Sequence, residues 1–163
     1  MRVVLTLGLC VLSACHTSPR AAVNARAVAG DTLRGVVAIE GSEPATRVIL
    51  VGANGRTELT SPSVRFFRLL GLDVQVSGRA LGSGFSVSDY RVRAAHGLAA
   101  LDGTLRTRDG RMYLSLTDGG ERAIPQNGGL PPSLVGSRVW VVLSADGAIV
   151  EFGSLEATRG PSR

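Results

Sequence analysis

Lysine is absent from this sequence, and all 18 basic side chains are arginines. This absence excludes functions that depend on a lysine amine, such as a Walker-type phosphate loop, a Schiff base or a Ser–Lys pair. Histidine occurs only at His16 and His96, and no G-x-S-x-G motif is present. A histidine-based nucleophile needs its base in hydrogen-bond contact with an activated serine or cysteine. We therefore expect a protein that is not an enzyme and has no cofactor.

Cysteine is also scarce, with only Cys10 and Cys15, and aromatic residues make up 4% of the chain. Two cysteines this close to the N-terminus exclude a structural zinc site of the cysteine type, and no acidic spacing resembles a calcium loop. We expect no metal site. Four aspartates each precede a glycine and are expected to be turn residues, because aspartate tolerates positive φ. They are Asp102, Asp109, Asp118 and Asp146.

The N-terminus combines Arg2 with an uncharged apolar run from Val3 to Leu12. A run of this length is too short for a membrane-spanning helix, which needs about 20 residues, but it suits a secretory signal. It ends in Leu12-Ser13-Ala14-Cys15. This tetrapeptide, in this context, resembles the lipobox of bacterial lipoproteins.

The resemblance implies that residues 1–14 are a signal peptide and that Cys15 is lipidated, becomes the new N-terminus and is then acylated, for example with palmitate. Residues 15–30 are then the lipid anchor and a flexible tether. Each buried CH₂ of the acyl chains contributes about 0.8 kcal/mol to membrane binding. His16 stands where lipoproteins retained at the inner membrane usually have aspartate, which implies the outer membrane, facing the periplasm or the cell surface. An ordinary cleaved signal with a chance cysteine is the alternative.

Residues 31–93 predict strands at 33–40, 46–52, 57–59, 72–76 and 85–93, with a short helix at 62–71 between the third and fourth. In that helix, Val64, Phe67 and Leu70 recur at helical spacing, and we expect Phe67 and Leu70 to face the core. Three strands, a helix and two strands is an order similar to that of the OB-fold, a small five-stranded barrel.

The same order recurs at 101–155, after a small-residue linker at 94–100 and before a C-terminal tail at 156–163. The expected fold class is therefore all-β with short helices, arranged as two tandem OB-like β-barrels. A single ten-stranded sandwich or barrel is the competing arrangement.

The repeat is clearest where LLGLDVQVSG at 69–78 aligns with LVGSRVWVVL at 134–143. The alignment places Val74 and Val76 opposite Val139 and Val141 on the inner face, so that Trp140 points outward. A large indole on an outer face is expected to be covered. Packing against the first module is the favoured interpretation, and a partner interface is the alternative.

Residues 16–100 contain ten arginines and six acids, whereas 101–163 contain seven of each. Arg65 and Arg68 lie one helical turn apart, and Arg91 and Arg93 alternate along a strand, so each pair is expected to share a face. Lipid headgroups or acidic glycans are candidate anionic partners. No nucleic-acid partner is expected, because strands two and three carry almost no aromatic platform.

These patterns together favour a membrane-anchored lipoprotein of the bacterial cell envelope that acts as a non-catalytic binding or scaffolding module. Its expected partners are the membrane, through the lipid on Cys15, and an envelope protein or an acidic glycan. The alternatives are an envelope enzyme, an accessory subunit of one, or a binder of anionic glycans or headgroups through the arginines of the first barrel.

Overall fold

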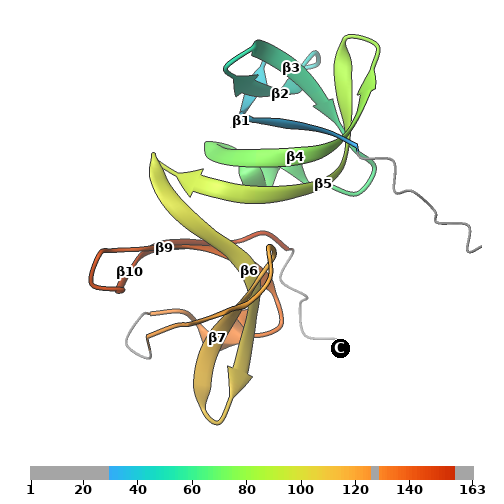
Figure 1. The fold of residues 1–163 in the computed structure, drawn as a ribbon. Helices are drawn as coiled ribbons and strands as arrows, with labels where there is room; N and C mark the ends of the chain where they lie inside the picture. The colour runs from blue at the N-terminus through green and yellow to red at the C-terminus, as the bar shows by residue number, and fades with distance from the viewer. Residues whose placement is uncertain (1–29, 126–128, 157–163) are drawn as a thin grey trace, which may run out of the picture.

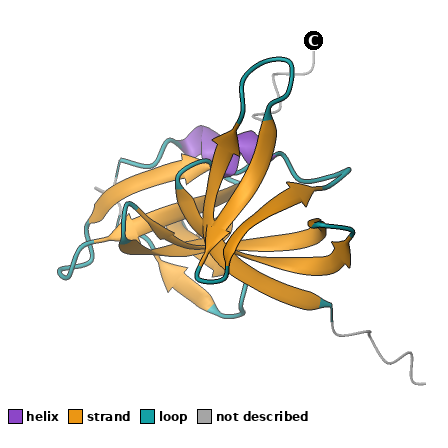
Figure 2. Ribbon diagram, turned by 90° about the horizontal axis from the view of Figure 1, so that it is seen from above, coloured by secondary structure: helices purple, strands orange, loops and turns teal. Residues whose placement is uncertain are grey.

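A computed structural model describes residues 30–125 and 129–156 and is mostly β, with helix confined to short segments (Figures 1 and 2). The all-β fold class is therefore confirmed. The predicted signal at 1–14, the tether up to residue 29 and the tail from 157 onward lie outside the described residues.

The first half contains five strands and a 3-10 helix: β1 (Asp31–Glu40), β2 (Arg47–Gly52), β3 (Gly55–Thr60), η1 (Phe66–Leu69), β4 (Leu72–Leu81) and β5 (Gly84–Ala95). The second half repeats this order: β6 (Leu98–Arg108), β7 (Arg111–Leu116), β8 (Glu121–Ala123), η2 (Pro132–Leu134), β9 (Arg138–Leu143) and β10 (Ile149–Ser154). Each half thus has three strands, one short helix and two strands.

The strand pairings also correspond. In the first half β1 pairs with β2 and β4, β2 with β3, β4 with β5, and β3 runs parallel to β5, which links the five strands in a cycle. In the second half β6 pairs with β7 and β9, β7 with β8, and β9 with β10. No pairing between β8 and β10 closes the cycle among the strands that the structure describes.

The register of the two halves is equivalent residue by residue. Gly71, at φ 79°, donates its N–H to the carbonyl oxygen of Val37 at 2.9 Å, and Gly136, at φ 88°, donates to that of Leu105 at 2.8 Å. Both glycines follow the 3-10 helix, where a left-handed residue turns the chain into the next strand. The cross-strand partners Leu33–Val76, Arg34–Gln75 and Gly35–Val74 match Leu101–Val141, Asp102–Trp140 and Gly103–Val139.

The segment predicted as a linker at 94–100 is instead the tip of a hairpin that joins the halves. β5 continues to Ala95 and β6 begins at Leu98, so only His96 and Gly97 form the turn. Both have positive φ, at 48° and 80°, as a two-residue hairpin turn of type I′ requires. The small residues in this segment suggested a linker, but Ala94 and Ala95 belong to β5, and Ala99 and Ala100 belong to β6.

The predicted helix at 62–71 is reduced to η1, and its buried face differs from the expected one. Phe66 and Leu69 are buried, whereas Phe67 is 68% and Leu70 37% exposed. The prediction was wrong because it assumed a continuous helical face from Val64. A single 3-10 turn has three residues per turn, which places Phe66 and Leu69 on one side.

Within the described part of the chain, the buried apolar residues form two clusters. The first fills the space among β1 to β5 and also includes three residues of the second half, Trp140, Val142 and Leu155. The second consists of Leu105, Leu114, Ile124, Leu130, Val139 and Val141. The first cluster therefore extends across the contact between the halves and makes that contact part of the core.

Candidate functional site

Trp140 lies on β9 where the second half meets the first, and it is 7% exposed. Its neighbours β6 and β10 place Asp102 and Gly153 directly opposite it. A Cβ atom added to Gly153 would lie 2.6 Å from the indole Nε1 and 2.8 Å from Cε2, so the indole occupies the space above this glycine. Because Trp140 belongs to the first core cluster, it packs against the first half of the chain.

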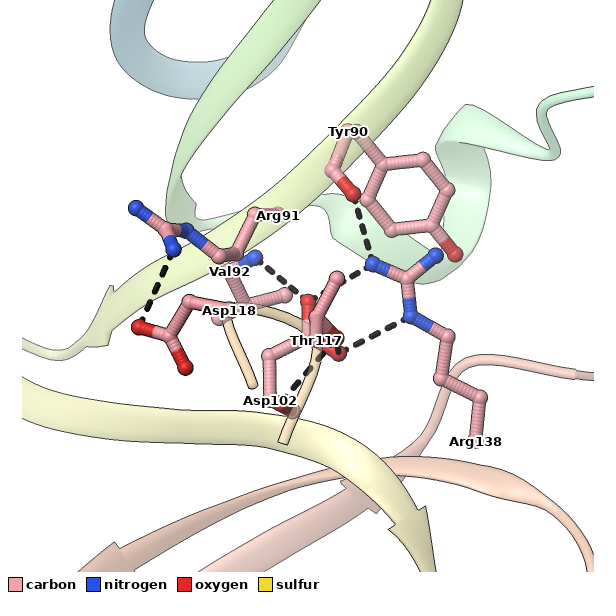
Figure 3. Close-up of polar contacts among 7 residues, drawn as sticks. All are labelled: Tyr90, Arg91, Val92, Asp102, Thr117, Asp118 and Arg138. Carbon is pink, nitrogen blue, oxygen red and sulfur yellow. Dashed lines mark hydrogen bonds and ion pairs between the residues drawn. The ribbon is translucent and has the colours of Figure 1, made fainter. Parts of the chain in front are cut away.

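Beside the indole, Asp102 and Arg138 form a buried ion pair that meets β5 (Figure 3). The Arg138 guanidinium donates to Asp102 through Nε at 2.9 Å and through Nη2 at 2.8 Å. Only 1% of the Asp102 side chain and 19% of the Arg138 side chain are exposed. The two-bond geometry is the strongest form of arginine–carboxylate contact.

The pair also satisfies the backbone of β5 at a part of its edge that has no strand neighbour. Asp102 Oδ2 accepts the N–H of Val92 at 2.8 Å, and Arg138 Nη2 donates to the carbonyl oxygen of Tyr90 at 2.5 Å. Among the strands that the structure describes, β5 pairs on this edge with β3 up to Ser86 and with β6 from Ala94, and with none in between. One acceptor and one donor from side chains thus replace the hydrogen bonds that a further strand would make.

Two further contacts surround the ion pair (Figure 3). The hydroxyl of Thr117, in the turn after β7, lies 3.1 Å from both Oδ1 and the carbonyl oxygen of Asp102. Arg91 on β5 forms an ion pair with Asp118 at 3.0 Å. Three segments of the second half, namely β6, β9 and the β7–β8 turn, therefore hold β5 of the first half.

The electrostatics of the contact stabilise the charged pair and the neutral phenol beside it. Burial opposes the charge of Arg138, but its hydrogen bonds and attraction to Asp102 outweigh burial and raise the pKa of the guanidinium. Burial raises the pKa of Tyr90, partly offset by Arg138, whose guanidinium carbon lies 4.3 Å from the ring centroid.

This contact has little capacity for catalysis. Both Asp102 oxygens accept hydrogen bonds, and the two charges neutralise each other, so neither group is available to move a proton or to bind an anion. No buried side-chain nitrogen or oxygen lacks a partner among the residues that the structure describes. The arrangement instead fixes the two halves against each other.

Asp102 was expected to be a turn residue, and that prediction was wrong. The dipeptide Asp102-Gly103 lies inside β6. Its glycine does not serve a turn, because a Cβ atom at Gly103 would collide with the carbonyl oxygen of Ser115 on β7. The internal repeat could have identified this pair. It aligns Asp102 with Arg34 and Arg138 with Asp73. In the first half Arg34 and Asp73 form an ion pair with the two charges exchanged.

The four arginines predicted to bind anions lie in two separate places. Arg65 and Arg68 line a cavity of about 440 Å³ beside η1, whereas Arg91 and Arg93 line one of about 200 Å³ at the contact between the halves. The second cavity also includes Asp102 and Asp118, and Arg91 is already paired. The structure therefore brings each pair together but does not join them into one site.

The remaining candidates do not gather into a site. His96 is exposed in the hairpin turn, with Nε2 3.3 Å from Glu151 Oε1. Within residues 30–125 and 129–156, no group of three or more His, Cys, Asp or Glu side chains is placed to hold a metal ion. None of the helices in the described part of the chain has the length and apolar character needed to cross a membrane.

Comparison with protein-family models, with curated proteins and with solved structures finds no match to this chain.

Proposed function

We propose that this chain is a lipid-anchored protein of the bacterial cell envelope that acts as a non-catalytic binding or scaffolding module. The anchor is supported by Leu12-Ser13-Ala14-Cys15 at the end of a ten-residue apolar run. Acyl chains on Cys15 would hold the module at a membrane and raise its concentration near a partner there. The absence of aspartate after Cys15 supports the outer membrane as its location.

The module itself is proposed to be a tandem of two OB-like barrels, one from 31–93 and one from 101–155. Support comes from the equal element order, the equivalent register and the cyclic pairing of β1, β2, β3, β5 and β4. In the second unit the three-residue β8 leaves the cycle open among the described strands. Because the barrels share a core cluster, they act as one body.

The observation that carries the non-catalytic role is the contact between the halves, where the buried charges pair with each other. Asp102 is the only buried charged residue in the described part of the chain, and its ion pair holds one half to the other. The enzyme alternative requires a general base near a nucleophile, whereas His96 contacts a glutamate in an exposed turn. A second alternative, anion binding at Arg91 and Arg93, is weakened by the two acids in the same cavity.

The anchor is tested by metabolic labelling with palmitate in a bacterial host. We expect wild type and Cys10→Ser to be labelled, because Cys10 lies inside the apolar run, and Cys15→Ser to be unlabelled. Persistent labelling of Cys15→Ser would refute the lipobox interpretation. The scaffolding role is tested by detergent solubilisation, pull-down and mass spectrometry, and binding of an acidic glycan with no protein recovered would refute it.

A further inference from the structure

An aromatic side chain stands exposed on the first half, between two arginines. Phe67 is 68% exposed, and Leu70, three residues further on, is 37% exposed. Arg65, Phe67 and Arg68 line one cavity beside η1, and Leu70 follows η1 directly. These four residues are called the Phe67 patch below.

The charge of the Phe67 patch is not balanced by the protein. No ion pair joins Arg65 or Arg68 to an acid among the described residues, although four other arginines of the first half are paired, namely Arg34, Arg47, Arg56 and Arg91. The adjoining cavity of about 440 Å³ is lined by Val48, Val64 and Phe66 in addition to three residues of the patch, and by no acidic side chain. An exposed ring flanked by free guanidinium groups suits an anionic interface with an apolar layer beneath it.

The described chain begins beside the connection that leads into this patch. Fifteen residues, 16–30, connect Cys15 to β1, and even a fully extended chain of that length spans at most about 50 Å. The described chain starts at Gly30, which lines the same cavity of about 670 Å³ as Pro62 and Ser63. The connection containing Ser63 leads into η1, so the first described residue and the start of the patch lie on neighbouring parts of the fold.

We propose that the Phe67 patch is a membrane-contact surface: Phe67 inserts its ring among the headgroups of the bilayer that holds the anchor, while Arg65 and Arg68 bind lipid phosphates. The contact fixes the orientation of the protein relative to the membrane. The position of the bilayer in this inference rests on the proposed lipid anchor. The affinity for anionic headgroups depends on the Phe67 patch alone.

The test places a tryptophan at the patch of the full-length lipidated protein. Phe67→Trp is read by acrylamide quenching after reconstitution into vesicles of phosphatidylcholine, with or without added phosphatidylglycerol. The native Trp140 is buried and contributes little quenching. We expect the introduced indole to be shielded in the vesicles that contain phosphatidylglycerol and accessible in those that do not.

Two variants serve as matched controls. Adding Arg65→Ala and Arg68→Ala to Phe67→Trp is expected to lower the ratio of docked to undocked protein about 30-fold, since each basic residue near an anionic surface contributes about 1 kcal/mol. Adding Arg106→Ala and Arg111→Ala removes the same charge from exposed arginines of the second half and should leave shielding intact. Val150→Trp, at an exposed position of β10, should remain quenched in every vesicle.

The outcomes separate this inference from the proposed function. Protein that floats with the vesicles while the introduced indole stays fully quenched in both compositions overturns the membrane contact and leaves the anchor intact. Shielding of that indole only in native envelope membranes also overturns it, because the occupant is then a protein. If the wild-type chain takes up no palmitate, the proposed anchor is wrong. The membrane contact is then tested by flotation of the protein with vesicles that contain phosphatidylglycerol. Flotation supports the contact, and failure to float overturns it.

Discussion

Removal of the Asp102 carboxylate should destabilise this protein far more than removal of the equivalent charge in its first half. Asp102→Ala leaves Arg138 as a mostly buried cation without its counter-ion and leaves the N–H of Val92 without an acceptor. Breaking a buried pair from one side costs about 3–5 kcal/mol. Arg34→Ala breaks the equivalent pair with Asp73, whose side chains are 60% and 25% exposed, and an exposed pair contributes about 0–1 kcal/mol.

Urea unfolding followed by Trp140 fluorescence measures both effects in one assay. Trp140 is the only tryptophan of the chain and lies directly across the strand pair from Asp102. The double variant Asp102→Ala with Arg138→Ala should cost less than the sum of the single variants, because it leaves no buried charge uncompensated. Circular dichroism at the same urea concentrations checks that the fluorescence change reports unfolding of the whole β structure.

Exchange of the two charges tests the geometry more sharply. Asp102→Arg with Arg138→Asp restores the attraction, but the new arginine has no acceptor for the Val92 N–H and the new aspartate has no donor for the Tyr90 carbonyl oxygen. We expect this exchange to remain destabilised, whereas Arg34→Asp with Asp73→Arg should unfold close to wild type. A cost below about 1 kcal/mol for Asp102→Ala, or full recovery in the Asp102/Arg138 exchange, would show that the buried pair does not hold β5.

Three further results are expected. Phe66→Ala should cost about 3–5 kcal/mol by urea unfolding, whereas Phe67→Ala should stay within about 0.5 kcal/mol of wild type; equal costs would contradict the assigned faces of η1. Gly103→Ala should lower the thermal midpoint, because its Cβ would collide with the Ser115 carbonyl oxygen, and an unchanged midpoint would exclude that close approach. Burial raises the pKa of Tyr90 above its unfolded value of about 10, so the unfolded chain loses this proton first and the free energy of unfolding should fall as the pH rises above 10. Tyr90→Phe should remove that part of the alkaline loss, and identical pH profiles would contradict it.

Local patterns in the sequence predicted most of the strands and their order. Alternating apolar residues identified β4 and β9. The alignment on Gly71 and Gly136 held in three dimensions, because both residues take positive φ and donate to equivalent carbonyls. Such features depend on a few neighbouring residues, which a sequence shows directly.

The contact between the halves depended on residues far apart in the chain, and single-residue patterns missed it. Asp102 and Gly103 had the form of a turn signal, yet Gly103 is required by the backbone of β7 and Asp102 by the backbone of β5. Small side chains at Ala94, Ala95 and Ala99 suggested a linker, although they pair across a hairpin. Neither requirement is visible until the strands are packed.

The two ion pairs show how equivalent positions acquired different roles. Arg34–Asp73 and Asp102–Arg138 join the same two strands of each half, at the same register and with opposite polarity. In the first half the pair faces solvent. In the second half the Asp102 carboxylate on β6 accepts the N–H of Val92, and the Arg138 guanidinium on β9 donates to the carbonyl oxygen of Tyr90. With the two charges exchanged, neither hydrogen bond to β5 could form. The polarity of the second pair is therefore set by its contact with the first half.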